Sequence, residues 1–364
     1  MTVLAIPGPL DPHVHLRDAD WAHKGTVASE TAAALAGGYW AVVDMPNTPP
    51  TPTDPARLTD RLDLLARDAC SDVGLWMGAG AGSWPEGFGV VPASVVGLKL
   101  YLDATTGTLK VATVEERDRL VGAWQVATPR PIAVHAEGTT LASLMDLVRT
   151  LVGLRVHVCH VSTREEVTLI RRARADGLPV TAGVTPHHLV LTRDDEAALG
   201  ARADVRPRLG SVADRDALWA ALTDGTIDCV ESDHAPHTLA EKASATPPHG
   251  VPGLETTLPL LGQAVHEGRL TAERLVEIVA SAPHRITGLV PPAGTETLLD
   301  LDASWVIEDQ GLHTAVGWSP FAGMRVHGRV REVRIGGRLA FDGERVLRAP
   351  GAGALLQPGA GPAA

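Results

Sequence analysis

Short apolar runs alternate with longer helical patterns along most of the chain. Eight of these runs have the length of a strand, and they lie near residues 10–16, 40–45, 73–79, 96–102, 131–136, 155–161, 179–184 and 227–232. The stretches between them that carry a helical period include 24–36, 54–69, 113–126, 163–176 and 213–223. Alternating strands and helices indicate a parallel sheet. Eight repeats predict an α/β fold of the closed (β/α)8 TIM-barrel type over residues 10–290.

The last third of the chain follows a different pattern. Helical periods near 254–267 and 271–280 are followed by alternation with one slip, at Val326, Gly328, Val330, Val333 and Ile335. Spacing of this kind is typical of antiparallel strands. We therefore expect a small β-rich appendage formed by residues 1–9 together with 291–350. Residues 351–364 are mostly Gly, Ala and Pro and are expected to form a flexible tail.

Composition indicates a soluble globular enzyme. The formal net charge of -11 argues against a surface for nucleic acids or anionic membranes. The three cysteines are too few and too scattered for a disulfide framework, and no apolar run reaches the roughly 18 residues of a membrane helix. The first residues lack the basic start and apolar core of a signal peptide, so we expect a cytoplasmic protein.

The first predicted strand carries two histidines one residue apart. Because alternate residues of a strand point to the same face, His13 and His15 turn their rings the same way. Neutral imidazole is the commonest ligand for zinc-like ions. Arg17 continues the alternation and suggests a substrate with a negative charge.

Metal-capable side chains recur at the ends of other predicted strands, where a barrel places its active site. A single histidine at a strand end is more often structural. Six such residues on five strands favour a metal site instead, and they are His13, His15, Lys99, His135, His160 and Asp233.

Lys99 lies within an apolar run, where a charged amine is costly to bury. One interpretation is a surface lysine whose amine reaches solvent. The other is a neutral amine that has added carbon dioxide, because burial lowers the pKa of lysine. The resulting carbamate could bridge two metals about 3.5–4 Å apart, whose bound water would ionise near neutral pH.

An ordered set of motifs over nearly the whole chain resembles the cyclic amidohydrolases, and specifically the dihydroorotases. The motifs are DPHVHLRD (11–18), AVVDMPNTPP (41–50), GLKLYL (97–102), AVHAE (133–137), HVCHVS (157–162), VTPHHL (184–189), DVRPRLGS (204–211), ESDHAPHTLAEK (231–242) and PPHGVPGLET (247–256). The chain is particularly similar to the dihydroorotase domain of the animal multifunctional pyrimidine-synthesis protein.

The resemblance implies a role for each matched position. One zinc ion would bind His13, His15 and Asp233, a second would bind His135 and His160, and carbamylated Lys99 (N6-carboxylysine) would bridge them. The implied substrate contacts are Arg17, Asn47, Arg206, His237 and the segment from His249 to Gly253. Residues 103–108 resemble a mobile loop of the family, in which Thr105 matches a threonine that reaches the substrate and Thr106 replaces a bulky aromatic residue.

The implied reaction is the reversible hydrolysis of (S)-dihydroorotate to N-carbamoyl-L-aspartate in de novo pyrimidine (UMP) biosynthesis. A metal-bridging hydroxide would attack the ring, and Asp233 would carry the proton. The resemblance also suggests a homodimer and association with aspartate carbamoyltransferase.

Some positions depart from the family pattern. Gly183 replaces a glutamate that supplies a ligand to a third zinc in the animal relative, so we expect two metals although Cys159 is retained. His187 and His188 match a motif but are expected to have a structural role at a helix start.

Two other functions stay open. A hydantoinase or allantoinase is disfavoured by Arg17 with Asn47 and Arg206. A non-catalytic scaffold for aspartate carbamoyltransferase is disfavoured because all six metal ligands are present.

Overall fold

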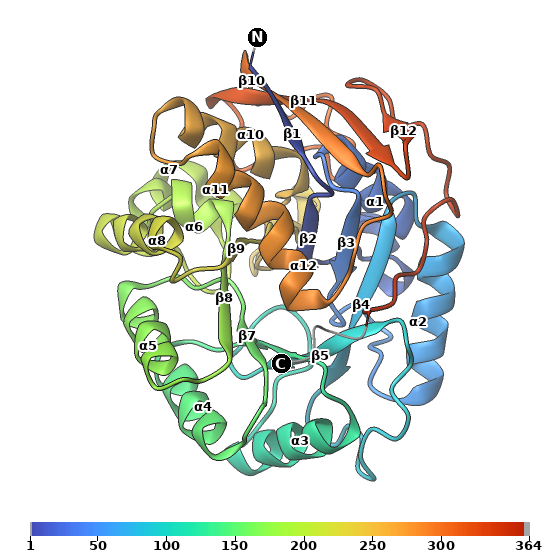
Figure 1. Ribbon diagram of the computed structural model, residues 1–364, viewed down its shortest axis with the longest axis vertical. Helices are drawn as coiled ribbons and strands as arrows, with labels where there is room; N and C mark the ends of the chain where they lie inside the picture. Colours follow the sequence, from blue (N-terminus) through green and yellow to red (C-terminus); the bar gives the residue numbers. More distant parts are fainter. Residues whose placement is uncertain (1, 360–364) are drawn as a thin grey trace.

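The computed structural model describes residues 2–359 and contains the predicted barrel (Figure 1). Eight strands pair in chain order, each parallel to the next. They are β2 (Leu10–Val14), β3 (Ala41–Asp44), β4 (Asp72–Ala79), β5 (Val95–Tyr101), β6 (Ile132–His135), β7 (Val156–Val158), β8 (Val180–Val184) and β9 (Cys229–Val230). A bridge between Val14 and His234 brings the last strand to the first. All eight predicted strands are confirmed, and each lies within a few residues of its expected position.

Helices lie in the connections between these strands, except between β4 and β5, where residues 80–94 contain no helix, and they pack against the outside of the barrel (Figure 1). The longer ones are α1 (Val27–Ala36), α2 (Pro55–Asp68), α3 (Val114–Ala127), α4 (Gly138–Thr150), α5 (Arg164–Ala175), α8 (Val212–Asp224) and α10 (Leu254–His266). The shorter ones are α6 (Pro186–Val190), α7 (Glu196–Leu199), α9 (Leu239–Lys242), α11 (Ala272–Val276) and α12 (Ala282–Thr287). Among residues 2–359, no helix combines the length and apolar character that crossing a membrane requires.

Hydroxyl side chains set where several helices begin. The side chains of Thr113, Thr163 and Ser211 each accept a hydrogen bond from the backbone N–H three residues later. This contact satisfies one of the N–H groups that a helix leaves unpaired in its first turn. The predicted boundaries of α3, α5 and α8 therefore agree with the structure to within one residue.

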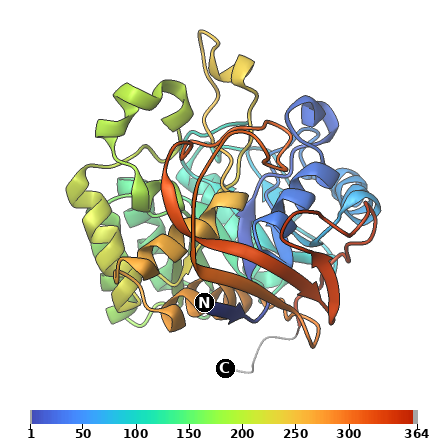
Figure 2. The same cartoon turned by 90° about the horizontal axis from the view of Figure 1, so that it is seen from above.

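The terminal segments form a separate antiparallel sheet, as the alternation predicts. Its strands are β1 (Val3–Ile6), β10 (Glu296–Val306), β11 (Arg325–Ile335) and β12 (Arg338–Phe341), in the order β1-β10-β11-β12. Figure 2 shows this sheet lying across one side of the barrel. The slip in the alternation corresponds to a register shift where Leu298 faces Glu332 but Leu299 faces Val330. The domain boundaries after residues 9 and 290 remain a prediction.

The expectation of a flexible tail is wrong for the part of it that the structure describes. The Val73 N–H donates to the Ala354 carbonyl (2.9 Å), and the Leu356 N–H donates to the Val73 carbonyl (2.8 Å). Leu355 and Leu356 also pack against the barrel core. Two leucines within a segment rich in Gly and Ala provide the apolar contact that composition alone does not reveal. Residues 360–364 lie outside the described residues.

A buried ion pair between α2 and the end of β3 stabilises the segment that carries Arg17. Along α2 the buried residues Leu58, Arg61, Leu62 and Leu65 form one face. From this face Arg61 donates to the Asp44 carboxylate at the end of β3 (2.6 Å) and to the Arg17 carbonyl (2.9 Å). The side chains of Arg61 and Asp44 are both buried. This pair therefore fixes the backbone directly after β2.

We predict that Arg61→Met lowers the free energy of unfolding by about 3–5 kcal/mol, because it leaves the Asp44 carboxylate buried without its partner. Urea denaturation of the purified protein measures this change. Arg67→Met is the control, because its ion pair with Asp68 lies at the surface, where solvent screens it, and its loss should change the stability little. Equal effects of the two substitutions would contradict the proposed support.

Candidate active site

A pocket lies where the barrel strands end, and most of the predicted site residues line it. Its lining includes His13, His15, Arg17, Asn47, Tyr101, Thr105, Thr106, His135, His160, Arg206, Asp233, Ala235, His249 and Gly250. The carboxyl ends of the strands of a (β/α)8 barrel form its active-site face in characterised enzymes. Of the residues named from the sequence, Lys99 and His237 are near the pocket without lining it.

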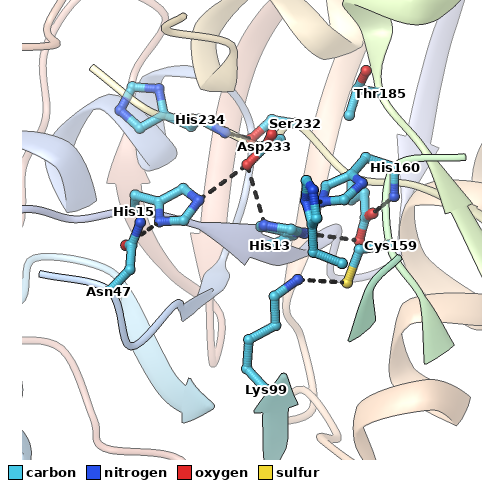
Figure 3. A network of polar contacts seen from close by, with 12 residues as sticks. His13, His15, Asn47, Lys99, Cys159, His160, Thr185, Ser232, Asp233 and His234 are labelled. Carbon is cyan, nitrogen blue, oxygen red and sulfur yellow. Dashed lines mark hydrogen bonds and ion pairs between the residues drawn. The ribbon is translucent and has the colours of Figure 1, made fainter. Parts of the chain in front are cut away.

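His13, His15 and Asp233 form the centre of the site (Figure 3). The Nε2 atoms of His13 and His15 each lie 3.1 Å from Oδ1 of Asp233. The two histidines come from β2 and the residue just after it, so the alternation of the strand places them side by side. Burial acts to raise the pKa of Asp233, but the two imidazoles outweigh it and hold that pKa well below the usual range. The carboxylate is therefore ionised at neutral pH.

His135 and His160 lie next to this group. His135 Nδ1 is 3.1 Å from His160 Nε2, and the His160 ring centroid is 5.2 Å from that of His13. Ligand atoms of His13, His160 and Asp233 all lie within 4.8 Å of one another. Five predicted ligands from four strands thus converge in one place.

Lys99 is completely buried in β5, which excludes a surface lysine with its amine in solvent. Its Nζ lies 3.0 Å from the Cys159 sulfur (Figure 3). The amine is therefore inside the barrel, below the histidines. This position is consistent with the predicted bridging role but does not test it.

Asn47 determines which nitrogen of His15 carries the proton. Asn47 Nδ2 donates to the Thr106 carbonyl (3.0 Å), so its Oδ1, 2.6 Å from His15 Nδ1, accepts a hydrogen bond from that nitrogen. Burial lowers the pKa of His15 to about 4, although Asp233 acts in the opposite direction, and the ring is neutral at pH 7. His15 Nε2 therefore turns a lone pair toward the Asp233 carboxylate.

Two acceptors 3.1 Å apart repel each other unless a cation lies between them. A histidine whose other nitrogen donates to an oxygen acceptor is also the usual form of a metal-ligating histidine. The donor set of nitrogens and carboxylate suits a borderline divalent ion. The residues at this position therefore fit a metal ion.

Arg17 is the most deeply buried cation that lines the pocket. Its Nε donates to the Pro236 carbonyl (3.1 Å), and Nη2 lies 3.2 Å from His237 Nε2. Nη1 is buried without a hydrogen-bond partner. Burial lowers the pKa of Arg17 to about 10, which still leaves the guanidinium charged at pH 7. An anionic group of a ligand would satisfy this free donor.

The remaining predicted contacts divide into two groups. Arg206 and His249 line the pocket, and Arg206 Nη1 donates to the Asp204 carboxylate (2.9 Å). His237 lies behind Arg17, where its Nδ1 is 3.2 Å from Lys24 Nζ. The position of His237 suits support of Arg17 better than direct contact with a ligand.

His187 and His188 lie at the start of α6, as the sequence analysis expects. His188 contacts the Thr185 hydroxyl through Nδ1 (2.7 Å) and the Pro207 carbonyl through Nε2 (3.1 Å). Both ring nitrogens of His188 thus have protein partners. These contacts are consistent with the predicted structural role of His188, whereas His187 Nε2 is buried without a hydrogen-bond partner.

Glu231 is a residue of the site that the sequence analysis missed. It follows β9, is fully buried, and accepts a hydrogen bond from the His160 backbone N–H. Its Oε2 lies 3.5 Å from His13 Nδ1. The available signal was an acidic residue at the end of the apolar run that contains Ile227, Cys229 and Val230.

Comparison with known proteins gives the family, although no protein-family profile matches the chain. The chain is 41% identical over 352 residues to the multifunctional protein CAD of Squalus acanthias, which covers 96% of the chain and 15% of that protein. The chain is 38% identical over 386 residues to a dihydroorotase of Anaeromyxobacter dehalogenans, covering 94% of the chain and 87% of the relative.

A solved structure shares the fold. The L-hydantoinase of Arthrobacter aurescens superposes with a TM-score of 0.89 at 25% identity, covering 97% of this chain and 88% of that one. This likeness supports the barrel with its antiparallel appendage. The sequence relatives are more specific, because their identity extends over almost the whole chain. The chain belongs to the dihydroorotase family.

Proposed function

We propose that the protein catalyses the reversible hydrolysis of (S)-dihydroorotate to N-carbamoyl-L-aspartate, a step of pyrimidine biosynthesis. Membership of the dihydroorotase family supports the reaction class. The observation that carries the choice of substrate is Arg17, a buried guanidinium with a free Nη1 in the same pocket as the His13, His160 and Asp233 group. A small anionic ring substrate suits this combination.

We propose zinc as the resident metal. His13, His15 and Asp233 would hold one ion, His135 and His160 a second, and a carbamate formed on Lys99 would bridge them. Full burial of Lys99 supports the carbamate, because burial favours the neutral amine that reacts with carbon dioxide. When bound, the metals would activate water as a nucleophile and polarise the carbonyl that it attacks.

The residues of the chain would orient the substrate and move the proton. Arg17 would hold the substrate carboxylate through charge-assisted hydrogen bonds, with Asn47 as a second donor. Arg206 and His249 would contact the far side of the ring. Asp233 would accept the proton of the nucleophile and deliver it to the leaving ring nitrogen, a contribution that is typically worth about 10²–10⁴-fold in rate.

The loop that contains Thr105 and Thr106 lies over this pocket. The Thr106 hydroxyl donates to the His249 carbonyl (2.9 Å), and the Thr106 carbonyl accepts from Asn47. These contacts support a lid that excludes water during the reaction. We propose that Thr105, which also lines the pocket, contacts the substrate when the lid is closed.

The two alternative functions make different demands on the pocket. A hydantoinase or allantoinase acts on rings for which the Arg17 and Asn47 pair has no evident use. A non-catalytic scaffold has no need of a complete ligand set. A homodimer, a complex with aspartate carbamoyltransferase and a cytoplasmic location remain proposals that accompany the main one.

We expect purified, zinc-loaded protein to hydrolyse dihydroorotate in preference to hydantoin and allantoin. The three substrates are compared by kcat/KM, with zinc content measured by elemental analysis on the same samples. Turnover of hydantoin alone would favour the first alternative. Absence of turnover with full zinc occupancy would favour the scaffold.

Arg17→Ala should reduce kcat/KM for dihydroorotate by about 10- to 150-fold for each charged hydrogen bond lost, mainly through KM. Zinc content should stay near wild type, because Arg17 contacts none of the proposed ligands directly. Arg208→Ala is a matched control, since this exposed arginine lies two residues from Arg206 and outside the pocket. Parallel loss of zinc and activity in Arg17→Ala would show a structural role instead.

Lys99→Ala should lose zinc from the two proposed sites and with it the activity, because the bridging ligand is gone. Addition of a short carboxylic acid such as propionate should restore part of both, since the acid can occupy the space of the carbamate. Elemental analysis and circular dichroism separate metal loss from unfolding, and Lys110→Ala, at an exposed position, is the control. Full zinc occupancy in Lys99→Ala would contradict the carbamate bridge.

A further inference from the structure

A buried lysine and a buried histidine lie directly behind Arg17, outside the pocket itself. Lys24, at the end of a short 3-10 helix (Ala19–Lys24), is 4% exposed, and His237 is 0% exposed. Neither residue lines the pocket. Lys24 Nζ lies 3.2 Å from His237 Nδ1, and Arg17 Nη2 lies 3.2 Å from His237 Nε2. The imidazole is therefore held between two cations, one at each ring nitrogen.

The imidazole of His237 is neutral. Burial, followed by the charges of Arg17, Lys24 and Lys242, lowers the pKa of His237 far below its usual range. A neutral imidazole has one N–H and one lone pair, so only one of its nitrogens can accept a hydrogen bond. The two cations therefore cannot both donate to the ring.

Lys24 is the cation that donates to the ring. Its Nζ also lies 2.7 Å from Glu241 Oε1. Burial acts to raise the pKa of Glu241, but hydrogen bonds, led by the one with Lys24, outweigh it and lower that pKa to about 2. A carboxylate at this distance keeps the amine as an ammonium, which has three donors and no acceptor. His237 Nδ1 must then accept from this ammonium.

The other ring nitrogen of His237 carries the proton. Nε2 lies 3.1 Å from the His249 carbonyl, which can only accept. An N–H on Nε2 fits this contact, whereas a lone pair there would repel the oxygen. A protonated Nε2 cannot accept from Arg17. The 3.2 Å approach of Arg17 Nη2 to the ring is therefore a contact between two donors and not a hydrogen bond.

Arg17 consequently keeps both of its terminal nitrogens for a ligand. Within residues 2–359, Nη1 has no hydrogen-bond partner, and the contact with His237 is the only polar contact of Nη2. Nε, by contrast, donates to the Pro236 carbonyl (3.1 Å) and anchors the guanidinium. A guanidinium with both terminal nitrogens free can bind a carboxylate through two parallel hydrogen bonds. Donation from Nη2 to His237 would use up one of them.

We propose that Lys24 is a positioning residue that determines how Arg17 binds its ligand. By donating to Nδ1, its ammonium holds His237 in the Nε2–H form, and Arg17 then binds a substrate carboxylate with two terminal nitrogens instead of one. This inference rests on the proposed function only for the identity of the ligand, because the contacts among the three side chains are made without it.

Removal of the lysine has a defined consequence. In Lys24→Met, His237 Nδ1 loses its donor and Glu241 loses its ion-pair partner. Glu241 Oε2, 3.9 Å from Nδ1, is then available as an acceptor for a proton on that nitrogen. We expect the proton to move from Nε2 to Nδ1. Nε2 then accepts from Arg17 Nη2, and one donor for the carboxylate is lost.

NMR of full-length, zinc-loaded protein labelled with ¹⁵N-histidine shows which ring nitrogen carries the proton. The signals that disappear in His237→Gln identify residue 237. Wild type should show Nε2–H and Lys24→Met should show Nδ1–H. Glu241→Gln is the matched control, because it removes the same ion pair but leaves the donation from Lys24 to the ring, and it should keep Nε2–H.

Two results of this measurement would overturn the proposal. One is a wild-type His237 in the Nδ1–H form, which decides the question even if Lys24→Met does not fold. The other is an Nε2–H form that persists in folded Lys24→Met, because the lysine would then not determine the position of the proton. Circular dichroism establishes that each variant is folded.

Kinetics test the consequence for Arg17. Lys24→Met should raise KM for dihydroorotate about 10-fold or more, the typical effect of losing one hydrogen bond to a charged group, with little change in kcat. Glu241→Gln should keep KM near wild type. An equal rise of KM in both variants would mean that the ion pair only supports the fold, and would overturn the proposal.

A double-mutant cycle tests whether Lys24 acts through His237. The amide of His237→Gln can donate to the His249 carbonyl without help from a lysine, so adding Lys24→Met to this variant should change KM no further. The same rise of KM in both backgrounds would overturn the proposal.

The outcomes for this inference and for the proposed function are distinguishable. The NMR measurement needs no substrate, so the position of the proton is decided even in a protein that does not turn over dihydroorotate. An active protein in which Lys24→Met moves the proton but leaves KM unchanged would overturn the link to Arg17, while the proposed function would stand.

Discussion

The contact of Asp233 with His13 and His15 joins the end of the last barrel strand to the first, and the rest of the site depends on it. β9 has only two residues, so little ladder pairing holds it against β2. The seam instead contains the His15 N–H to His234 carbonyl hydrogen bond (2.8 Å) and the Ser232 N–H bonds to the Asp11 carboxylate (3.2 Å). Closing the barrel and assembling the site are therefore one event, because both use the same few residues.

The backbone is strained at three residues of the site, two near this seam and one after β7. Arg17, His160 and Asp233 have φ values of 58°, 37° and 45°, a region that residues with a side chain rarely adopt. Each such residue costs about 1–3 kcal/mol and persists only when its surroundings hold it. Two hydrogen bonds stabilise this conformation: Arg61 donates to the Arg17 carbonyl, and the His160 backbone N–H donates to the Glu231 carboxylate. All three residues follow the end of a strand. Their unusual backbone conformation turns the chain out of the strand direction and directs the three side chains toward the pocket.

The sequence predicted those features that depend on local period and on strand ends. All eight barrel strands and the convergence of His13, His135 and Asp233 follow from alternation and from the rule that parallel strands end at one face. Features that depend on contacts between distant segments were missed. The ordered start of the tail depends on Leu355 meeting Val73, and the proton position of His15 depends on Asn47 and Thr106. No periodicity in a single sequence encodes such pairs.

Glu231 shows why a residue cannot be interpreted from its own position alone. Gly183 by itself indicates the loss of a ligand, yet its missing side chain is what admits the carboxylate from the next strand. A carboxylate at both positions would place two anions in one volume inside the barrel, at a large cost in free energy. Only one of the two positions can carry it. The glycine and the glutamate therefore form a single feature of two paired strands, and the position of the Glu231 carboxylate beside His13 follows from their register.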